Sequence, residues 1–219
     1  TLLYHDNFDK QSNMYTQAIA RKNKLTSFLR ENNYERLSKR PNVTIYTGMG
    51  SFVSPNTVKV VLSEEEIELQ GKEIFINTGS TAIIPNIEGI QQSRNVYTST
   101  TLLDLDILPK HLIIIGGGYI GLEFASMYAG FGSKVTILEI GNRFMPRNDS
   151  DIAKSIREVM EKKGIEIRLN VRTQSIHDTH DGVTLTYSDT SDGTPYFVDG
   201  DAILVATGRK PMIEGLNLQ

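Results

Sequence analysis

Cysteine is absent from this sequence of 219 residues. The chain therefore has no thiol that could accept electrons or form a disulfide, and the absence fits a reducing compartment such as the cytoplasm. Long apolar runs are also missing, because 112–115, the longest near the centre of the chain, is far shorter than a bilayer-spanning helix. No secretory signal is visible. We expect a cytoplasmic protein with no membrane partner.

Charge and histidine placement argue against further classes of function. The formal net charge is −3 and no segment forms a basic run, so we expect no nucleic-acid partner. His177 and His180 lie close in sequence, but no cysteine or acidic cluster completes a metal site around them. We interpret both, and the isolated His111, as structural. No serine lies in a nucleophile-elbow context, so nothing supports a hydrolase.

The first part of the chain predicts a long helix followed by short strands. Residues 14–38 repeat apolar side chains near helical spacing, and Pro41 ends the helix. Strand-like runs follow, separated by turn residues, at 43–46, 57–62, 67–69 and 73–76. This pattern predicts a small antiparallel meander.

Beyond a crossing segment near 95–109, the pattern alternates between strand and helix. After a buried strand and a glycine turn, the expected elements are a helix at 119–131, a strand at 134–139, a helix at 149–163 and a strand at 165–169. This alternation predicts an α/β fold of the Rossmann type, with a parallel sheet and helices on both faces. Residues 171–198 predict a further antiparallel meander, and 202–205 a final buried strand.

The most specific motif is the glycine turn in the middle of this pattern. Residues 113–123 read Ile-Ile-Ile-Gly-Gly-Gly-Tyr-Ile-Gly-Leu-Glu, with Gly116, Gly118 and Gly121 at G-x-G-x-x-G spacing. The first glycine permits the tight turn, the second lets backbone approach a pyrophosphate, and the third lets the helix pack closely on the strand. The helix N-terminus offers free N–H groups to phosphates. We expect a dinucleotide site; a purely structural turn is the alternative.

Glu139 ends the next strand, at about the 20-residue spacing typical of such motifs. A carboxylate there accepts hydrogen bonds from the adenosine ribose hydroxyls and repels a 2′-phosphate, which favours NAD(H) over NADP(H). Arg143 lies close by in sequence and could soften this preference. An exposed strand-end carboxylate without a function is the alternative.

Other residues are less specific on their own. The strings Thr78-Gly79 and Thr207-Gly208 each end an apolar strand with a sharp exit, and as a pair they indicate backbone near a cofactor. Tyr119 and Glu123 stay open from spacing alone. The helix dipole favours a carboxylate near a helix start in any protein, and a tyrosine there can simply pack on a neighbour.

With these motifs the chain resembles the class I flavin-dependent pyridine nucleotide–disulfide oxidoreductases, which include dihydrolipoamide dehydrogenase, glutathione reductase and mercuric reductase. The resemblance covers essentially the whole chain and rests on 116–123, 78–80, Glu139 and 206–211. Within the family, the chain looks most like the reactive-chlorine-resistance and mercuric reductase-like flavoproteins.

The resemblance implies a domain order and a set of cofactor contacts. Residues 1–97 would be part of an FAD domain, 98–208 an inserted NAD(P)H domain, and 209–219 a return to the FAD domain. The residues that would approach FAD are Gly50, Thr78, Gly79 and Ser80. Those that would line the NAD pocket are Gly116, Gly117, Gly118, Tyr119, Ile120, Gly121, Glu123, Glu139, Val171 and Gly208.

Two residues would also take part in catalysis by the same resemblance. Tyr119 matches the side chain that lies over the flavin and swings aside for nicotinamide. Glu123 matches a carboxylate near the nicotinamide and the flavin. No metal ligand is implied.

The sequence also departs from the family, since it lacks the first G-x-G-x-x-G motif, the C-x-x-x-x-C redox helix, the later Gly-Asp flavin motif and the C-terminal dimerisation domain. We therefore interpret the chain as an internal fragment, inactive by itself, of a homodimeric enzyme. That enzyme would pass hydride from NAD(P)H to FAD and then electrons to a cysteine pair. Two alternatives stay open: a non-catalytic NAD(H)-sensing module, and a flavoprotein that reduces oxygen, quinone or metal ions directly.

Overall fold

The chain forms two compact units in the computed structural model, which describes residues 8–218. Of the described residues, unit 1 comprises 8–21 and 82–209, and unit 2 comprises 22–81 and 210–218. Helix α1 (Phe8–Ser38) begins in unit 1 and continues in unit 2. The units change near residues 81 and 209, whereas the sequence predicted functional boundaries at 97 and 208. Those boundaries concern cofactor binding and stay a prediction.

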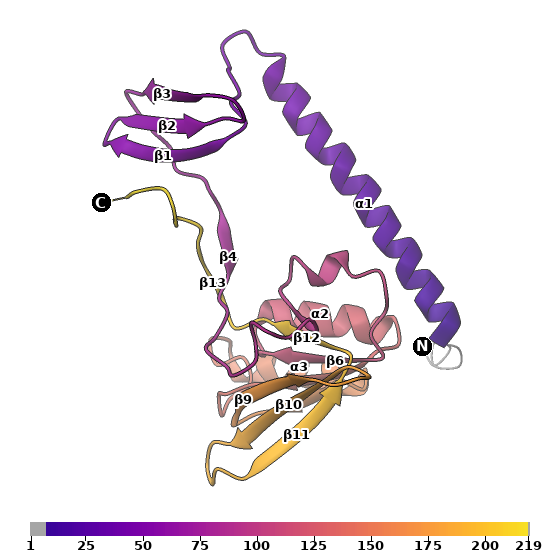
Figure 1. The fold of residues 1–219 in the computed structure, drawn as a ribbon. Helices are drawn as coiled ribbons and strands as arrows, with labels where there is room; N and C mark the ends of the chain where they lie inside the picture. Colours follow the sequence, from indigo (N-terminus) through magenta and orange to yellow (C-terminus); the bar gives the residue numbers. More distant parts are fainter. Residues whose placement is uncertain (1–7, 219) are drawn as a thin grey trace. The chain divides into compact units, whose positions relative to one another are not determined.

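A five-stranded parallel sheet forms the centre of unit 1 (Figure 1). Its strands, in spatial order, are β5 (Val96–Tyr97), β12 (Ala202–Val205), β6 (His111–Ile115), β7 (Lys134–Leu138) and β8 (Glu166–Arg168). Strand β6 lies in the middle, and the glycine turn follows its last residue. The predicted α/β class with a parallel sheet is confirmed.

Both faces of this sheet are buried, but by different elements. On one face Leu112 and Ile114 pack against α2 (Tyr119–Gly130), α3 (Ser150–Lys162) and the first half of α1. On the other face Ile113 and Ile115 pack against a three-stranded antiparallel meander (Figure 1). The meander consists of β9 (Val171–Asp178), β10 (Val183–Asp189) and β11 (Pro195–Gly200).

The prediction of helices on both faces is therefore wrong in this detail. After β8 the chain continues into the meander rather than into another crossover helix. The inward side chains of the meander, Val183 and Leu185 among them, cover the sheet face that a helix would otherwise cover. The short 3-10 helix η1 (Leu102–Asp104) belongs to the opposite, helical face.

A pair of buried tyrosines attaches the first half of α1 to this helical core. The Tyr15 hydroxyl donates to the Leu105 carbonyl at 2.8 Å and lies 3.0 Å from the Tyr128 hydroxyl. Tyr128 in turn donates to the Leu102 carbonyl at 3.1 Å. Burial raises the pKa of both tyrosines. The two hydroxyls are thus neutral and hydrogen-bonded inside the core.

Unit 2 contains a three-stranded antiparallel sheet of β1 (Met49–Ser54), β2 (Thr57–Val61) and β3 (Glu66–Gln70). The predicted strands at 57–62 and 67–69 are confirmed within a residue or two. Those at 43–46 and 73–76 are wrong.

The hairpin between β1 and β2 explains the first of these errors. The turn at Pro55-Asn56 sets a register that pairs Met49 with Val61, so residues 43–46 lie beyond the end of the partner strand. Residues 73–76 likewise pair with no strand among residues 8–218, and the side chain of Phe75 is 87% exposed. Alternating apolar residues form a strand only where a partner strand is available.

Besides the change within α1, the chain passes from one unit to the other at two places, and each lies within a short strand. Strand β4 (Ser80–Ala82) pairs with β13 (Arg209–Pro211).

The second half of α1 is exposed along the side that carries its apolar residues. These are Leu25, Phe28, Leu29 and Leu37. None of the helices within residues 8–218 is long and apolar enough to cross a membrane.

Candidate functional site

The glycines of the turn after β6 serve the separate steric purposes that the motif predicts. Gly116 has φ 108°, and a Cβ there would lie 2.5 Å from the Ala206 carbonyl oxygen. A Cβ at Gly121 would lie 2.2 Å from the Gly116 carbonyl oxygen, so the close approach of α2 to β6 requires glycine. A Cβ at Gly118 would meet nothing within 4 Å. The backbone at Gly118 thus borders open space.

The N-terminus of α2 at this turn is uncapped by protein. Gly118 is the N-cap residue, no side chain makes a capping hydrogen bond, and the first turn holds no acidic residue. Backbone N–H groups and the positive end of the helix dipole therefore remain available to an anion. This is the arrangement that binds a pyrophosphate in dinucleotide folds.

Glu139 lies directly beside the turn. Its Oε2 accepts a hydrogen bond from the Gly117 N–H at 2.7 Å, and its Oε1 accepts one from the Gly141 N–H at 2.8 Å. The register of the parallel strands, Ile115 opposite Leu138, brings the carboxylate to this place. Each oxygen retains a second acceptor site for a ligand hydroxyl.

These groups line a cavity of about 690 Å³ in unit 1. The predicted residues that it brings together are Gly116, Gly117, Gly118, Tyr119, Ile120, Glu139, Val171 and Gly208. The Thr207 hydroxyl donates to the Ile83 carbonyl at 3.0 Å and Ile83 N–H donates to Gly208, which fixes this part of the wall. A cavity of this size at the carboxyl ends of parallel strands is the usual ligand position in such sheets.

Two predicted residues of α2 do not line this cavity. Gly121 is buried behind the turn, in contact with β6. Glu123 is exposed on α2 and is absent from the cavity wall. Its predicted role near nicotinamide and flavin stays a prediction.

The residues predicted to approach FAD belong to unit 2. They are Gly50, Thr78, Gly79 and Ser80. Gly79 has φ 77°, and a Cβ there would meet nothing within 4 Å. The Thr78 hydroxyl donates to the Met212 carbonyl at 2.6 Å, and the Met212 N–H donates to the Gly79 carbonyl at 3.0 Å. Thr78 and Gly79 are thus held by the backbone of Met212, with open space at Gly79.

Sequence reasoning missed several polar residues of the cavity wall, three of which come from the segments after Glu139 and Val171. Arg147, Asn148 and Arg172 all line it, whereas Arg143, which the sequence singled out, does not. Neither Arg147 nor Arg172 forms an ion pair with a carboxylate in the described part of the chain. The basic residues in the segment after Glu139 were the sequence feature that could have indicated positive charge in the cavity wall. The loop conformation, with Met145 at φ 47°, decides which of them turns toward the cavity.

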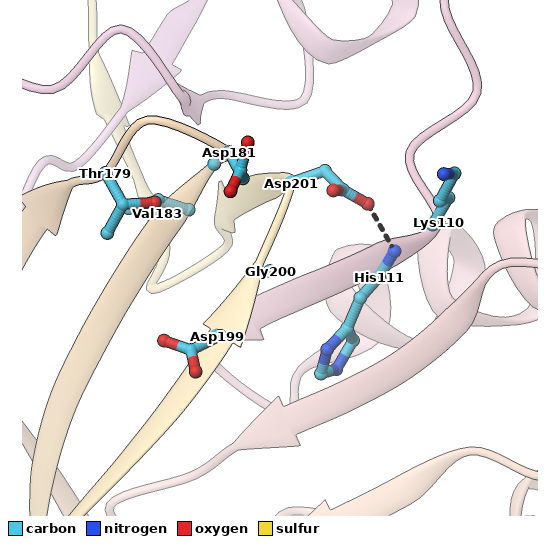
Figure 2. Close-up of a pocket in the computed structure, with 9 residues that line it drawn as sticks. Lys110, His111, Thr179, Asp181, Val183, Asp199, Gly200 and Asp201 are labelled. Carbon is cyan, nitrogen blue, oxygen red and sulfur yellow. Dashed lines mark hydrogen bonds between the residues drawn. The ribbon is translucent and has the colours of Figure 1, made fainter.

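A second cavity, of about 440 Å³, lies at the amino-terminal end of β6 (Figure 2). The Asp201 carboxylate accepts a hydrogen bond from the His111 backbone N–H at 2.7 Å, and His111 Nε2 lies 2.9 Å from Thr136 Oγ1. Burial and the nearby Lys134 lower the pKa of His111. Within residues 8–218 no group of three or more histidine or acidic side chains is placed to hold a metal. The backbone and ring of His111 thus have protein partners, Asp201 and Thr136.

The fold and the glycine turn define a Rossmann-type α/β protein, and comparison with known proteins identifies its family. Residues 5–219 match the family described as "Pyridine nucleotide-disulphide oxidoreductase", and the chain belongs to it. This confirms the family resemblance that the motifs indicated.

Two curated relatives give the extent of the similarity. The chain is 41% identical over 215 residues to "Probable pyridine nucleotide-disulfide oxidoreductase RclA" of Escherichia coli (strain K12), which covers 98% of this chain and 47% of that protein. It is 36% identical over 186 residues to "Dihydrolipoyl dehydrogenase, mitochondrial" of Pisum sativum, which covers 84% of this chain and 37% of that protein. The chain thus spans about half the length of these relatives or less.

A solved structure supports the same fold. The "Cu(II) complex of HOCl-induced flavoprotein disulfide reductase RclA from Escherichia coli" matches with a TM-score of 0.85 and 40% identity, over 95% of this chain and 47% of that one. The Rossmann-like α/β class is therefore shared with flavoprotein disulfide reductases.

Proposed function

We propose that residues 82–209 bind NAD(H) and form the pyridine-nucleotide-binding part of a flavin-dependent oxidoreductase. One observation carries this proposal: the open backbone at Gly118 and the uncapped start of α2 lie beside a carboxylate, Glu139, that is fixed on the glycine turn. An anion-binding helix end next to a hydroxyl-binding carboxylate matches a nucleotide's pyrophosphate and ribose.

The same geometry favours NAD(H) over NADP(H). The Glu139 carboxylate borders the cavity and would accept hydrogen bonds from ribose hydroxyls, whereas a 2′-phosphate would bring two negative charges together. Arg147 and Arg172 add positive charge to the wall and attract the pyrophosphate of either nucleotide. The discrimination therefore depends on Glu139 rather than on the overall charge of the cavity.

FAD is the second cofactor that family membership implies, and unit 2 is its proposed place. The open space at Gly79 fits a backbone segment that a cofactor approaches, and Gly50, Thr78 and Ser80 would complete this contact. Bound flavin would accept hydride from NADH. A later transfer to a cysteine pair would use residues outside this sequence, because the 219 residues contain no cysteine. We further propose that the complete protein is a cytoplasmic homodimer.

Calorimetric titration with NADH and NADPH tests the nucleotide assignment. We expect both to bind with one site per chain and NADH to bind more tightly. Gly118→Ala serves as the control, since it fills the space at the turn without touching other protein atoms. If neither nucleotide binds at millimolar concentration, the proposal is wrong. Hydride transfer from NADH to FAD in the complete protein would separate an oxidoreductase from a module that only senses NAD(H).

A further inference from the structure

Residues 85–95, the segment that leads from β4 to β5, form part of one wall of the candidate nucleotide cavity. The first three residues of this segment line the cavity, and so do the first three residues of β9. Directly after them, Glu88 forms a parallel bridge with Ser175, and the Ile176 N–H donates to the Glu88 carbonyl at 2.8 Å. The segment and β9 therefore leave the cavity side by side and in the same direction.

A turn in this segment packs directly against β9. Gly89 has φ 80°, and a Cβ there would lie 1.9 Å from the Ile176 carbonyl oxygen, so this close approach requires glycine. The N–H groups of Gln92 and Ser93 both donate to the Gly89 carbonyl, at 3.2 and 3.1 Å. Ile90 is buried in the core between the parallel sheet and the meander. The turn is therefore compact, and it is joined directly to the stretch that lines the cavity.

The carboxylate of Asp178, the last residue of β9, holds the far end of the segment. Its Oδ1 accepts hydrogen bonds from the Ser93 hydroxyl at 2.5 Å and from Asn95 Nδ2 at 3.2 Å, and its Oδ2 accepts one from the Arg94 N–H at 2.9 Å. Desolvation raises the pKa of this carboxyl, but these hydrogen bonds and the nearby Arg94 charge together lower it below its ordinary value. One charged side chain thus fixes three consecutive residues.

The segment lies on the side of the cavity away from Glu139. The Thr207 hydroxyl donates to the Ile83 carbonyl, and the Ile83 N–H donates to the Gly208 carbonyl, so the chain enters the segment beside the end of β12. In the sheet, β12 and β7 flank β6 on opposite sides, and Glu139 follows β7. A dinucleotide with its pyrophosphate at the glycine turn and its adenosine ribose at Glu139 extends its nicotinamide riboside toward the segment.

Resting on the proposed nucleotide-binding function, we propose that Asp178 is a positioning residue that holds residues 85–95 against β9 and thereby shapes the part of the cavity that receives the nicotinamide riboside. Asp178 itself does not line the cavity. Without its carboxylate, Ile90 still anchors the middle of the segment, but the hydrogen bonds at the far end are lost. A nucleotide must then order this wall as it binds, which lowers its affinity.

Calorimetric titration with NADH and with ADP tests this role, because ADP carries the adenosine and two phosphates but lacks the nicotinamide riboside. We expect Asp178→Ala to raise the dissociation constant of NADH by about two- to thirtyfold and to leave that of ADP unchanged. Asp178→Asn keeps Oδ1 as an acceptor and should lose less NADH affinity. Asp199→Ala is the matched control, since Asp199 is an exposed carboxylate of the same meander that accepts a hydrogen bond from Thr184.

The outcomes separate this inference from the proposed function. Wild-type protein that binds neither NADH nor NADPH would remove the nucleotide-binding proposal and the role of Asp178 with it. Wild-type protein that binds NADH, combined with an Asp178→Ala variant of unchanged NADH affinity, would overturn the positioning role alone. Equal losses for NADH and ADP would do the same, because they would show a general effect on the site. Thermal unfolding of each variant confirms that folded proteins are compared, and Asp178→Asn provides the test if Asp178→Ala does not fold.

Discussion

Oε2 of Glu139 accepts a hydrogen bond from the backbone N–H of Gly117 at 2.7 Å. The bond links the end of β7 to the glycine turn after β6, so the carboxylate and the turn form one structural element. The other oxygen of the same carboxylate accepts the Gly141 N–H. Glu139 therefore holds the backbone of the site in addition to its proposed contact with ribose, and substitutions separate these two contributions.

Replacing Glu139 with alanine removes both its hydrogen bonds to the backbone and its proposed contact with ribose. We expect Glu139→Ala to weaken NADH binding by about 1–3 kcal/mol, the usual effect of losing charge-assisted hydrogen bonds. Glu139→Gln keeps one oxygen that accepts a backbone N–H and should lose less. Both variants should bind NADPH better relative to NADH, since the negative charge is gone. Calorimetry with each nucleotide measures this, and unchanged NADH affinity in Glu139→Ala would sink the assignment.

Two glycines of the motif give opposite predictions for stability and binding. Gly121→Ala places a methyl group 2.2 Å from the Gly116 carbonyl oxygen and should lower the free energy of unfolding by about 2 kcal/mol or more. Gly118→Ala meets no protein atom within 4 Å and adopts an extended backbone, so its stability should change by less than about 1 kcal/mol. Only Gly118→Ala should lose nucleotide binding while folding normally. Urea denaturation and NADH titration of both variants check the contrast.

The parts of the site that could be predicted from the sequence are those whose chemistry is local. The G-x-G-x-x-G spacing specifies steric needs within one strand–turn–helix segment, and these hold at Gly116 and Gly121. Parallel pairing of consecutive strands then places Glu139 beside the turn without further information. The glycine motif and the fold class could therefore be predicted from the sequence alone.

The parts that could not be predicted depend on contacts between distant segments. Tyr119 meets Asn148, which lies 29 residues further along the chain, and the loop before Asn148 contains Met145, a non-glycine residue with φ 47° that no spacing rule indicates. Residues 74–76 are a run of strand-forming apolar residues, but pairing depends on a partner strand that local sequence does not reveal. The helices and the meander likewise cover opposite sheet faces because of long-range packing.

The arginines of the cavity wall should contribute through charge. Arg147→Ala and Arg172→Ala each remove from the wall a guanidinium that forms no ion pair within residues 8–218, and we expect each to weaken NADH binding by about 0.5–1.5 kcal/mol at low ionic strength. The effect should shrink as salt is added. Arg143→Ala makes the same change in net charge outside the wall and is the control. Equal losses in all three variants would show that only net charge matters.

The tyrosine pair predicts a stability effect far from the nucleotide. Tyr128→Phe removes the side-chain donor to the Leu102 carbonyl, which keeps the Leu105 N–H as a donor, and should lower the free energy of unfolding by about 0.5–1.5 kcal/mol. Tyr15→Phe should act similarly, and the double variant should lose less than the sum, because the two hydroxyls lie 3.0 Å apart and are neighbours in one polar cluster. Tyr196→Phe, at an exposed position, is the control. Additive losses measured by denaturation would contradict this coupling.

His111 predicts how stability depends on pH. Burial and Lys134 lower its pKa in the folded protein, so the folded state resists a proton that the unfolded chain accepts near pH 6.5. The stabilisation is fully present above that pH and is lost as pH falls from about 6.5 through the lower folded pKa. The nearby carboxylates of Asp201 and Glu166 oppose the shift without reversing it.

Substitution of this histidine isolates its contribution. Denaturation midpoints of the wild type should fall more steeply between pH 7 and pH 5 than those of His111→Gln, which cannot titrate. His180→Gln is the control, because that side chain is 98% exposed. Identical slopes in the wild type and His111→Gln would show that other groups determine the acid sensitivity. A change in slope confined to His111→Gln would show that this part of the acid sensitivity arises at the amino-terminal end of β6, where the histidine ring contacts Thr136.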